Sequence, residues 1–514
     1  MLAASAGVDV LAPCGFDHRR MIGLSIALAV SITMMSVLAA VNELATTGAS
    51  VVWTQDDPPA RRLRELLERG AFVEVRRWLP SVPDERLRDE GMDMMLRIER
   101  DFSLDAAGVL QQLREVLPDA RDADVIAWTR SGELQHRVID GRPRYFRRAV
   151  ANLLRFNVEA QRRRDAARPR ETNTGAERHE AAFTLNGHLE QLVLESDRSD
   201  AVELMPIRTR VTYVLTVPGN ARAAKPGALL RAWLPMPKSI GPQRDVRLVS
   251  ATPEPKLVAP EQAPQRTVYF EKVLSDPAVP QRFEMVVEYT TAARYPRLDP
   301  RKVEPLPADW GDRWLRAREP HIVVDDRMRE LALSIVGEQK NPLEQARLLF
   351  EWMDREVRWC HEIEYSIVPS LPRKLLATRR GDCGVQSMLY ISLCRSIGIP
   401  ARWQSGWTTD PFQGGNLHDW TEIYVEPWGW IPVDPSYGRK QHHDPRVRDF
   451  YFGHLDGYRM IVSGDFGAPL VPPKRSLRSE PLDFQRGEVE IDGINLYFNE
   501  WDYEARFEHI PIKP

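Results

Sequence analysis

The stretch from Gly381 to Tyr437 constrains this 514-residue chain most, because it holds a cysteine, a histidine and an aspartate in three separate settings. Cys383 follows a Gly-Asp pair and precedes a periodic apolar run that ends at Gly398. The run predicts a helix with a glycine at its carboxyl end, so Cys383 lies at the helix start. The exposed N–H groups there favour thiolate over thiol. We therefore expect Cys383 to be reactive at mildly acidic pH.

His418 and Asp434 lie in segments that predict two paired strands. His418 opens a β-rich stretch, and Asp434 directly follows the short strand 429–433. Because residues at matching heights on paired strands touch, we expect His418 to meet Asp434. A thiol nucleophile needs a base, and that base needs a third group to fix its tautomer. Cys383, His418 and Asp434 supply one candidate for each role, whereas Cys394 is interpreted as a small buried hydrophobe.

The sequence from about 341 to 437 resembles the transglutaminase-like superfamily, which includes transglutaminases, peptide N-glycanases and bacterial cysteine peptidase-type proteins. The resemblance rests on Gly381-Asp382-Cys383, on the run from Leu393 to Arg402, on Gly406-Trp407, on His418 to Val425, and on Gly429 to Pro435. These stretches cover roughly a fifth of the chain.

The resemblance implies a papain/transglutaminase-like catalytic domain with Cys383 as nucleophile, His418 as general base and acid, and Asp434 as the orienting group. Asp419 stands where many relatives carry a small residue. The superfamily usually has an oxyanion donor upstream of the cysteine. The candidates are Trp359, Tyr365 and the backbone N–H of Cys383.

The whole chain predicts an α+β protein in which a β-sandwich and an N-terminal, mainly helical region precede the catalytic domain. The predicted regions are a signal peptide or membrane anchor at 1–40, a mainly helical domain with a β-hairpin at 55–160, a linker and helical segment at 161–204, a β-sandwich at 205–296, the catalytic domain at 320–465 and a C-terminal extension with a hairpin at 466–514.

The N-terminal segment has the pattern of an export signal. His18-Arg19-Arg20 precedes an uncharged apolar run from Met21 to Val41. The run is also long enough to span a bilayer. We therefore expect an exported, periplasmic or extracytoplasmic protein, with membrane anchoring as the alternative. The cysteines that follow the export segment, Cys360, Cys383 and Cys394, are expected to be unpaired.

Three further patterns receive ordinary structural interpretations. The hairpin at 134–146 is rich in arginine, but an exported chain of net charge −3 predicts no nucleic-acid partner. His442-His443-Asp444, with His454 nearby, lacks the spacing of an established zinc motif, so no metal or cofactor is expected. The catalytic segment is rich in tryptophan, and these side chains either line an acceptor groove or belong to the core: Trp403, Trp407, Trp420, Trp428 and Trp430.

The function that these patterns predict is cysteine-dependent acyl transfer on an amide of a peptide or protein substrate, through a thioester on Cys383. With water as acceptor the enzyme is a peptidase or amidase, and with an amine it is a transamidase. The alternative is a catalytically inactive extracytoplasmic binding or scaffold protein.

Overall fold

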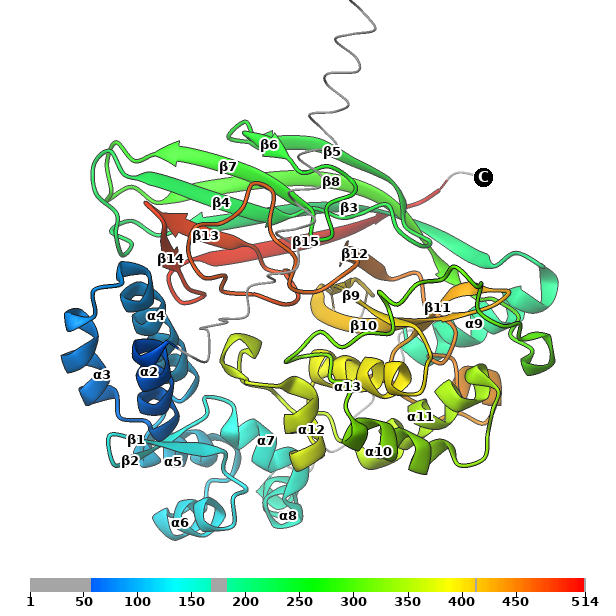
Figure 1. Cartoon of the computed structure of the whole chain (residues 1–514), viewed down its shortest axis with the longest axis horizontal. Helices are drawn as coiled ribbons and strands as arrows, with labels where there is room; N and C mark the ends of the chain where they lie inside the picture. Colours follow the sequence, from blue (N-terminus) through cyan, green and yellow to red (C-terminus); the bar gives the residue numbers. More distant parts are fainter. Residues whose placement is uncertain (1–56, 168–182, 412–413, 513–514) are drawn as a thin grey trace, which may run out of the picture. The chain divides into compact units, whose positions relative to one another are not determined.

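The computed structural model describes residues 57–167, 183–411 and 414–512, and it shows a mixed helix and sheet protein (Figure 1). The predicted export segment at 1–40 lies outside the described residues. Within those ranges, no helix combines the length and the hydropathy that a bilayer crossing requires.

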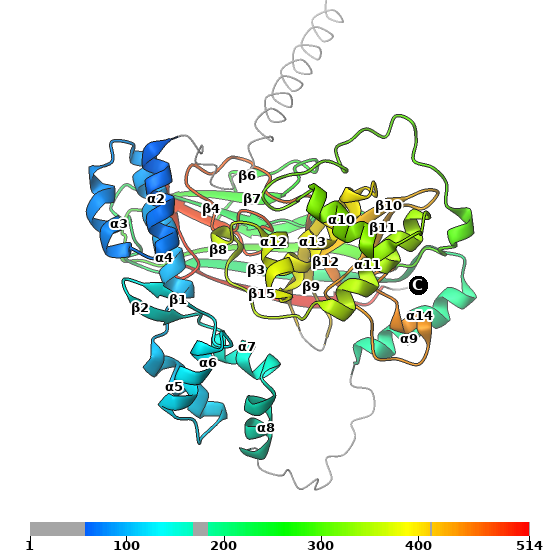
Figure 2. The same ribbon diagram turned by 60° about the horizontal axis from the view of Figure 1, so that its bottom comes forward.

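The first described part is helical and includes a two-stranded hairpin. Its helices are α2 (Pro58–Arg69), α3 (Phe72–Trp78), α4 (Glu85–Asp101), α5 (Ala106–Val116), α6 (Asp122–Arg130), α7 (Ala149–Phe156) and α8 (Val158–Ala167). The strands β1 (His136–Ile139) and β2 (Arg142–Tyr145) are joined by Asp140 and Gly141, both of which have a positive φ, as a tight two-residue turn requires. Figure 2 shows the hairpin between α2–α4 and α5–α7, and the apolar side chains of this part share one core.

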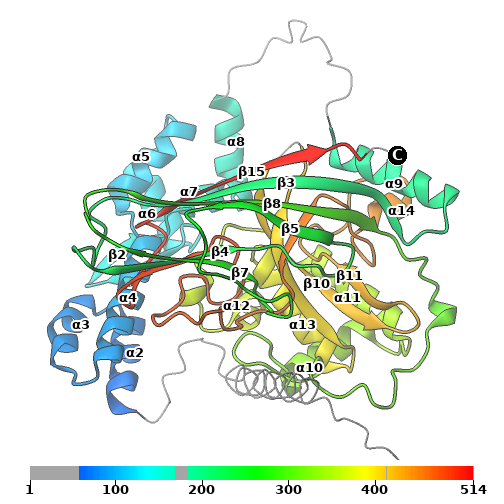
Figure 3. The same ribbon diagram turned by 90° about the horizontal axis from the view of Figure 1, so that it is seen from above.

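Two antiparallel sheets form a second core. One has the order β14 (Ile494–Leu496), β13 (Glu488–Ile491), β4 (Leu229–Pro235), β7 (Thr267–Val273), β6 (Leu257–Val258); the other has the order β15 (Asp502–Ile510), β3 (Glu203–Val217), β8 (Gln281–Arg294), β5 (Arg244–Thr252). Alternate residues of β3, namely Val211, Tyr213 and Leu215, are buried between the sheets. Figure 3 shows the two layers.

The C-terminal segment is part of these two sheets. β13 pairs with β4, and β15 pairs with β3 over its whole length. The sequence predicts separate regions at 205–296 and 466–514. The reason is that the alternation of apolar residues identifies a strand but not the strand with which it pairs. The strand pairing joins the two regions into one structural unit.

A third sheet carries the candidate site. Its order is β11 (Gly429–Val433), β10 (Asn416–Val425), β9 (Ala401–Thr408), β12 (Arg459–Ser463). Figure 1 shows the helices of this region along one side of the sheet: α10 (Asp326–Val336), α11 (Pro342–Glu356), α12 (Leu371–Thr378) and α13 (Cys383–Ser396). The helix α9 (Leu185–Arg198) and the short α14 (Pro445–Arg448) contribute apolar side chains to the same core.

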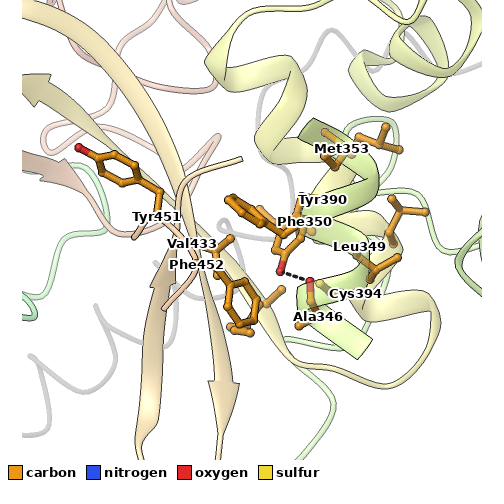
Figure 4. Packing of buried hydrophobic residues seen from close by; sticks show 14 of the residues in the cluster. Ala346, Leu349, Phe350, Met353, Tyr390, Cys394, Val433, Tyr451 and Phe452 are labelled. Carbon is orange, nitrogen blue, oxygen red and sulfur yellow. Dashed lines mark hydrogen bonds between the residues drawn. The ribbon is translucent and has the colours of Figure 1, made fainter. Parts of the chain in front are cut away.

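Helix α13 is held on all sides. The Asp382 side chain accepts a hydrogen bond from the Val385 N–H, which caps the helix start. Every residue from Gly384 to Ser396 is buried. Figure 4 shows this packing, in which the Tyr390 hydroxyl donates to the Ala346 carbonyl at 3.0 Å. The position of Cys383, the first residue of α13, is therefore fixed by the core.

Candidate active site

His418 and Asp434 lie on neighbouring strands and are bonded to each other. Strands β10 and β11 form the hairpin in which Thr421 pairs with Val433. This register brings the His418 Nε2 atom to 2.7 Å from Asp434 Oδ2, and both side chains are buried. The contact expected from the hairpin is present.

Asp434 is held by more groups than the sequence indicated. Its Oδ1 accepts hydrogen bonds from the Ser436 hydroxyl and the Tyr437 N–H. Its Oδ2 also accepts from Arg459 Nη1 at 3.1 Å. Burial opposes ionisation of Asp434, but His418 and Arg459 outweigh it and hold the pKa of this carboxyl well below its usual range. Because Asp434 is ionised, the imidazole of His418 donates to it through Nε2 and leaves Nδ1 for another partner.

The Cys383 thiol lies in the same cavity as His418, and its hydrogen-bond acceptor is Asp419. The Sγ atom is 3.6 Å from Asp419 Oδ2. Asp419 is the residue after His418 on β10, so one strand delivers both groups to the cavity. The carboxyl group of Asp419 thus lies beside the thiol.

A hydrogen-bond network surrounds Asp419. Its Oδ1 accepts from Gln485 Nε2 at 2.8 Å, and Gln485 Nε2 also donates to the His418 carbonyl at 2.8 Å. The Tyr365 hydroxyl is 3.5 Å from Asp419 Oδ2 and donates to Asp382 Oδ1 at 2.7 Å. Gln485 comes from the segment before β13, so the C-terminal part of the chain helps to position β10.

The environment of Cys383 raises the pKa of its thiol well above the usual value. Burial is the main cause, followed by the nearby carboxyls of Asp419 and Asp382. Burial and the neighbouring Asp483 likewise raise the pKa of Asp419, and burial and Glu362 raise that of Asp382 to about 7. The expectation of a low thiol pKa was wrong for the resting protein. The N–H groups at the start of α13 favour the thiolate, but burial and two carboxyl groups raise the thiol pKa by more.

The cavity at Cys383 has a volume of about 550 Å³ and is formed by three parts of the chain. The helical part contributes arginines, namely Arg147, Arg148 and Arg155. The segment before β13 contributes Ser479, Glu480, Pro481, Asp483, Gln485 and Arg486. No local sequence pattern relates these residues or Arg459 to Cys383, so the sequence does not predict them as part of the site. The one sequence feature that could have pointed to Arg459 is its position at the start of the otherwise largely apolar strand β12.

The candidate oxyanion donors differ in their availability. The Tyr365 hydroxyl donates to Asp382 and accepts from the Gly384 N–H at 3.1 Å, so its bonding capacity is largely used. A Cβ atom at Gly384 would lie 2.2 Å from that hydroxyl oxygen, which explains the glycine after Cys383. The indole of Trp359 lines the cavity.

The histidines near the C-terminal end of the catalytic segment do not form a shared site. His442 Nε2 contacts Glu190 at 2.7 Å, and the side chain of Asp444 caps α14. Both ring nitrogens of His454 contact backbone carbonyls. Within the described part of the chain, no three His, Cys, Asp or Glu side chains are arranged to hold a metal ion.

The tryptophans of the catalytic segment and the arginines of the hairpin at 134–146 have structural roles. Trp403, Trp407 and Trp420 are buried, and none of the five tryptophans of the catalytic segment is among the described residues that line the cavity. In the hairpin, Arg137 donates to the Leu67 carbonyl and Arg144 to that of Ser103. The described cysteines are free thiols: Cys360, Cys383 and Cys394.

The candidate site thus combines a cysteine at the start of α13 with a bonded His–Asp pair on adjacent strands. Residues 329–435 match the family model of the transglutaminase-like superfamily. The resemblance inferred from the sequence is thus confirmed over this segment, which includes Cys383, His418 and Asp434.

The similar proteins match only parts of the chain. The uncharacterized protein YebA of Bacillus subtilis is 24% identical over 147 residues, which are 25% of this chain and 19% of that protein. The peptide-N(4)-(N-acetyl-beta-glucosaminyl)asparagine amidase of Gallus gallus is 38% identical over 65 residues, 12% of this chain and 9% of the amidase. A crystal structure from Cytophaga hutchinsonii has a TM-score of 0.41 and 13% identity, over 60% of this chain and 93% of that one. The chain thus spans far less than two thirds of these curated relatives.

Proposed function

We propose that this protein is a cysteine-dependent acyl-transfer enzyme that acts on an amide bond of a peptide or protein. Cys383 is the nucleophile, His418 the general base and acid, and Asp434 the group that orients His418. The observation that carries the proposal is the buried 2.7 Å bond from Asp434 to His418, which lines the same cavity as Cys383.

The reaction follows from these roles. The Cys383 sulfur forms a bond to the amide carbonyl carbon while His418 takes the thiol proton on Nδ1, the nitrogen that does not face Asp434. The carbonyl oxygen becomes an oxyanion. His418 then gives the proton to the leaving nitrogen, the C–N bond breaks, and a thioester remains. Water attacks the thioester while His418 takes its proton, and the acid is released with the thiol restored.

The raised thiol pKa sets the timing of the proton transfer. Because the resting thiol is neutral, its proton leaves as the sulfur attacks rather than beforehand. The proposed oxyanion donors are the backbone N–H of Cys383, at the start of α13, and the indole N–H of Trp359. The hydroxyl of Tyr365 supports Asp382 and the Gly384 N–H instead.

Water is the acceptor that we favour, which makes the enzyme a peptidase or amidase. The reason is that water is present in large excess over amines. Transamidation follows the same steps with an amine in place of water, and product analysis distinguishes the two.

A catalytically inactive scaffold protein is the second candidate. It is favoured by the contact between the thiol and Asp419 and by the raised pKa of Cys383, since both reduce the thiolate population of the resting protein. In this case the cavity binds a peptide without cleaving it.

We also propose that the protein is exported and acts in the periplasm or another extracytoplasmic space. The support is the basic and apolar segment that ends at Val41, which lies outside the described residues. Fusion of residues 1–50 to an alkaline phosphatase that is active only after export tests this proposal. Sequencing of the mature N-terminus then distinguishes cleavage from anchoring.

The catalytic proposal is tested with a mixed library of peptidyl aminomethylcoumarin amides and with biotinylated pentylamine as a competing acceptor. We expect coumarin release by the wild-type protein and a loss of about 1,000-fold or more in Cys383→Ala and His418→Ala. Asp434→Ala should retain partial activity, since its role is orientation.

Cys394→Ala is the matched control, because Cys394 is a buried thiol of the same helix outside the cavity. It should remain active. If folded wild-type and Cys383→Ala proteins neither release coumarin nor incorporate the amine, the scaffold candidate replaces the enzyme.

A further inference from the structure

One wall of the cavity at Cys383 is basic and comes from outside the transglutaminase-like segment. Arg148 precedes the first residue of α7, and Arg155 lies in its last turn. Both line the cavity together with His361 and Cys383. We call Arg148, Arg155 and His361 the basic wall.

The two arginines of the basic wall lack acidic partners. Within the part of the chain that the structure describes, neither guanidinium forms an ion pair with a carboxylate. The neighbouring Arg147 pairs with Asp101 and Glu364 at 3.0 and 3.3 Å, and Arg486 pairs with Glu364 at 2.9 Å. The positive charges of Arg148 and Arg155 are therefore not held in ion pairs with the described carboxylates.

Two members of the basic wall, His361 and Arg155, are held in position by specific contacts. The side chain of Asn152 on α7 donates to the His361 carbonyl at 2.9 Å and accepts from the His361 N–H at 2.8 Å. The Arg155 guanidinium lies 4.3 Å from the ring centre of Trp359, and Trp359 packs edge-on against His361. These contacts fix α7 to the cavity before any ligand binds, which reduces the entropy cost of binding.

The carboxyl groups of the cavity leave this positive charge available. Six carboxyl side chains of the described residues line the cavity. Glu362 is paired with Lys374, Glu364 with Arg147 and Arg486, and Glu480 with Arg486. Burial raises the pKa of Asp382, Asp419 and Asp483, which favours their neutral form. Burial and the charges of Arg155, Arg148 and Arg147 lower the pKa of His361, so this imidazole already experiences the positive field of the wall. An anion bound to the basic wall would offset the positive charges that disfavour protonation of His361.

We propose that the basic wall selects substrates with a carboxylate near the scissile amide, so that Arg148 and Arg155 determine specificity for acidic peptides. The inference rests on the proposed acyl transfer at Cys383. Guanidinium groups bind carboxylates through paired, charge-assisted hydrogen bonds. The carboxylate can belong to an acidic side chain or to a chain end, because the two offer the same oxygens.

The test uses N-acetyl tripeptide vinyl sulfones, which alkylate a catalytic cysteine, with Glu, Gln or Lys placed at each of the three positions in turn. For wild type, we expect the best Glu probe to alkylate Cys383 about tenfold faster than its Gln counterpart at low salt, and the difference to shrink at high salt. The variant R148Q/R155Q should lose this preference. R77Q on α3, whose arginine lies outside the cavity, should keep it.

A second measurement needs no variant and identifies the source of the carboxylate. Alkylation by a Gln probe is followed in the presence of Ac-Ala-Glu-amide, of Ac-Ala-Gln with a free carboxyl end, or of neutral Ac-Ala-Gln-amide. At least one of the two anionic peptides should slow alkylation more than the neutral peptide, and the more effective one identifies the recognised group.

Two outcomes would overturn the inference in different ways. Equal alkylation by Glu, Gln and Lys probes, with equal inhibition by the three peptides, would reject the selectivity and leave acyl transfer standing. If no vinyl sulfone alkylated Cys383 while iodoacetamide did, the proposed function would fail and the selectivity with it.

Discussion

At the scale of single residues, the surroundings of Cys383 are the least expected feature of the site. The sequence identified the residue and its place at a helix start. It did not indicate that Asp419, one residue after the proposed base, turns toward the thiol. Neighbours on a strand normally point to opposite faces, so a local pattern gives no reason to place His418 and Asp419 at one cavity.

Replacing Asp419 by asparagine should make the resting thiol more reactive. The amide oxygen of the new side chain can still accept the bond from Gln485, but the carboxyl that helps to raise the thiol pKa is gone. We expect the midpoint of Cys383 alkylation by iodoacetamide to move to lower pH, with the rate at neutral pH rising by about tenfold per unit of pKa shift. Rates are measured by mass spectrometry across pH.

The control for this measurement is Asp326→Asn, which removes an exposed carboxyl from α10. Its alkylation profile should equal that of the wild type. An unchanged midpoint in Asp419→Asn would mean that burial alone sets the reactivity of Cys383.

Arg459 should be essential for stability. It is buried and contacts Asp434 at 3.1 Å and Asp456 at 2.9 Å. In Arg459→Gln two buried carboxylates lose their shared cation, so the free energy of unfolding should fall by about 3 kcal/mol. Urea unfolding measures this loss. Arg506→Gln, at an exposed position of β15, should differ little from wild type, and an equal loss in both variants would contradict the role of Arg459.

At the scale of elements, the sequence predicted what depends on neighbours along the chain. Helix α13 and the β10–β11 hairpin follow from local patterns of apolar and turn residues. The partners of β13 and β15 did not, because β15 pairs with a strand, β3, that lies far from it in the sequence. The cavity walls were missed for the same reason: α7 and the segment before β13 contact the site through space alone.

Gln485 tests whether the C-terminal segment supports the site. Its buried side chain donates to both the His418 carbonyl and Asp419. Gln485→Ala leaves these acceptors without a donor, so we expect the free energy of unfolding to fall by about 1–3 kcal/mol and amide cleavage to weaken. Gln111→Ala, at an exposed position of α5, is the control. Unchanged stability and activity would show that the segment only covers the cavity.

At the scale of the whole molecule, the buried carboxyls make stability depend on pH. Asp382 has a pKa of about 7 in the folded protein, chiefly through burial, against about 4 in an unfolded chain. Between these values the folded state keeps a proton that the unfolded state releases. The stability that Asp382 contributes is therefore fully present below about pH 4 and is lost as pH rises through 7.

Asp382→Asn isolates this contribution, because asparagine caps a helix as well as aspartate and can accept the same hydrogen bonds. Relative to wild type, the variant should gain up to about 4 kcal/mol more unfolding free energy at pH 8 than at pH 4, because a pKa raised from about 4 to about 7 has that effect. Urea unfolding at the two pH values gives the difference. Asp326→Asn should show no such change, and a pH-independent effect of Asp382→Asn would contradict a raised pKa.

The two sheets in which β13 pairs with β4 and β15 pairs with β3 also determine when the protein can finish folding. As the polypeptide leaves the ribosome, the edges of β3 and β4 stay open until residues 488–510 have emerged. Pairing across such a sequence separation is slow, because a long loop must close before the contacts form. The thiol-bearing pocket is thus assembled last, and a nascent chain that stalls before its final strands should be inert and should expose unpaired strands that favour aggregation.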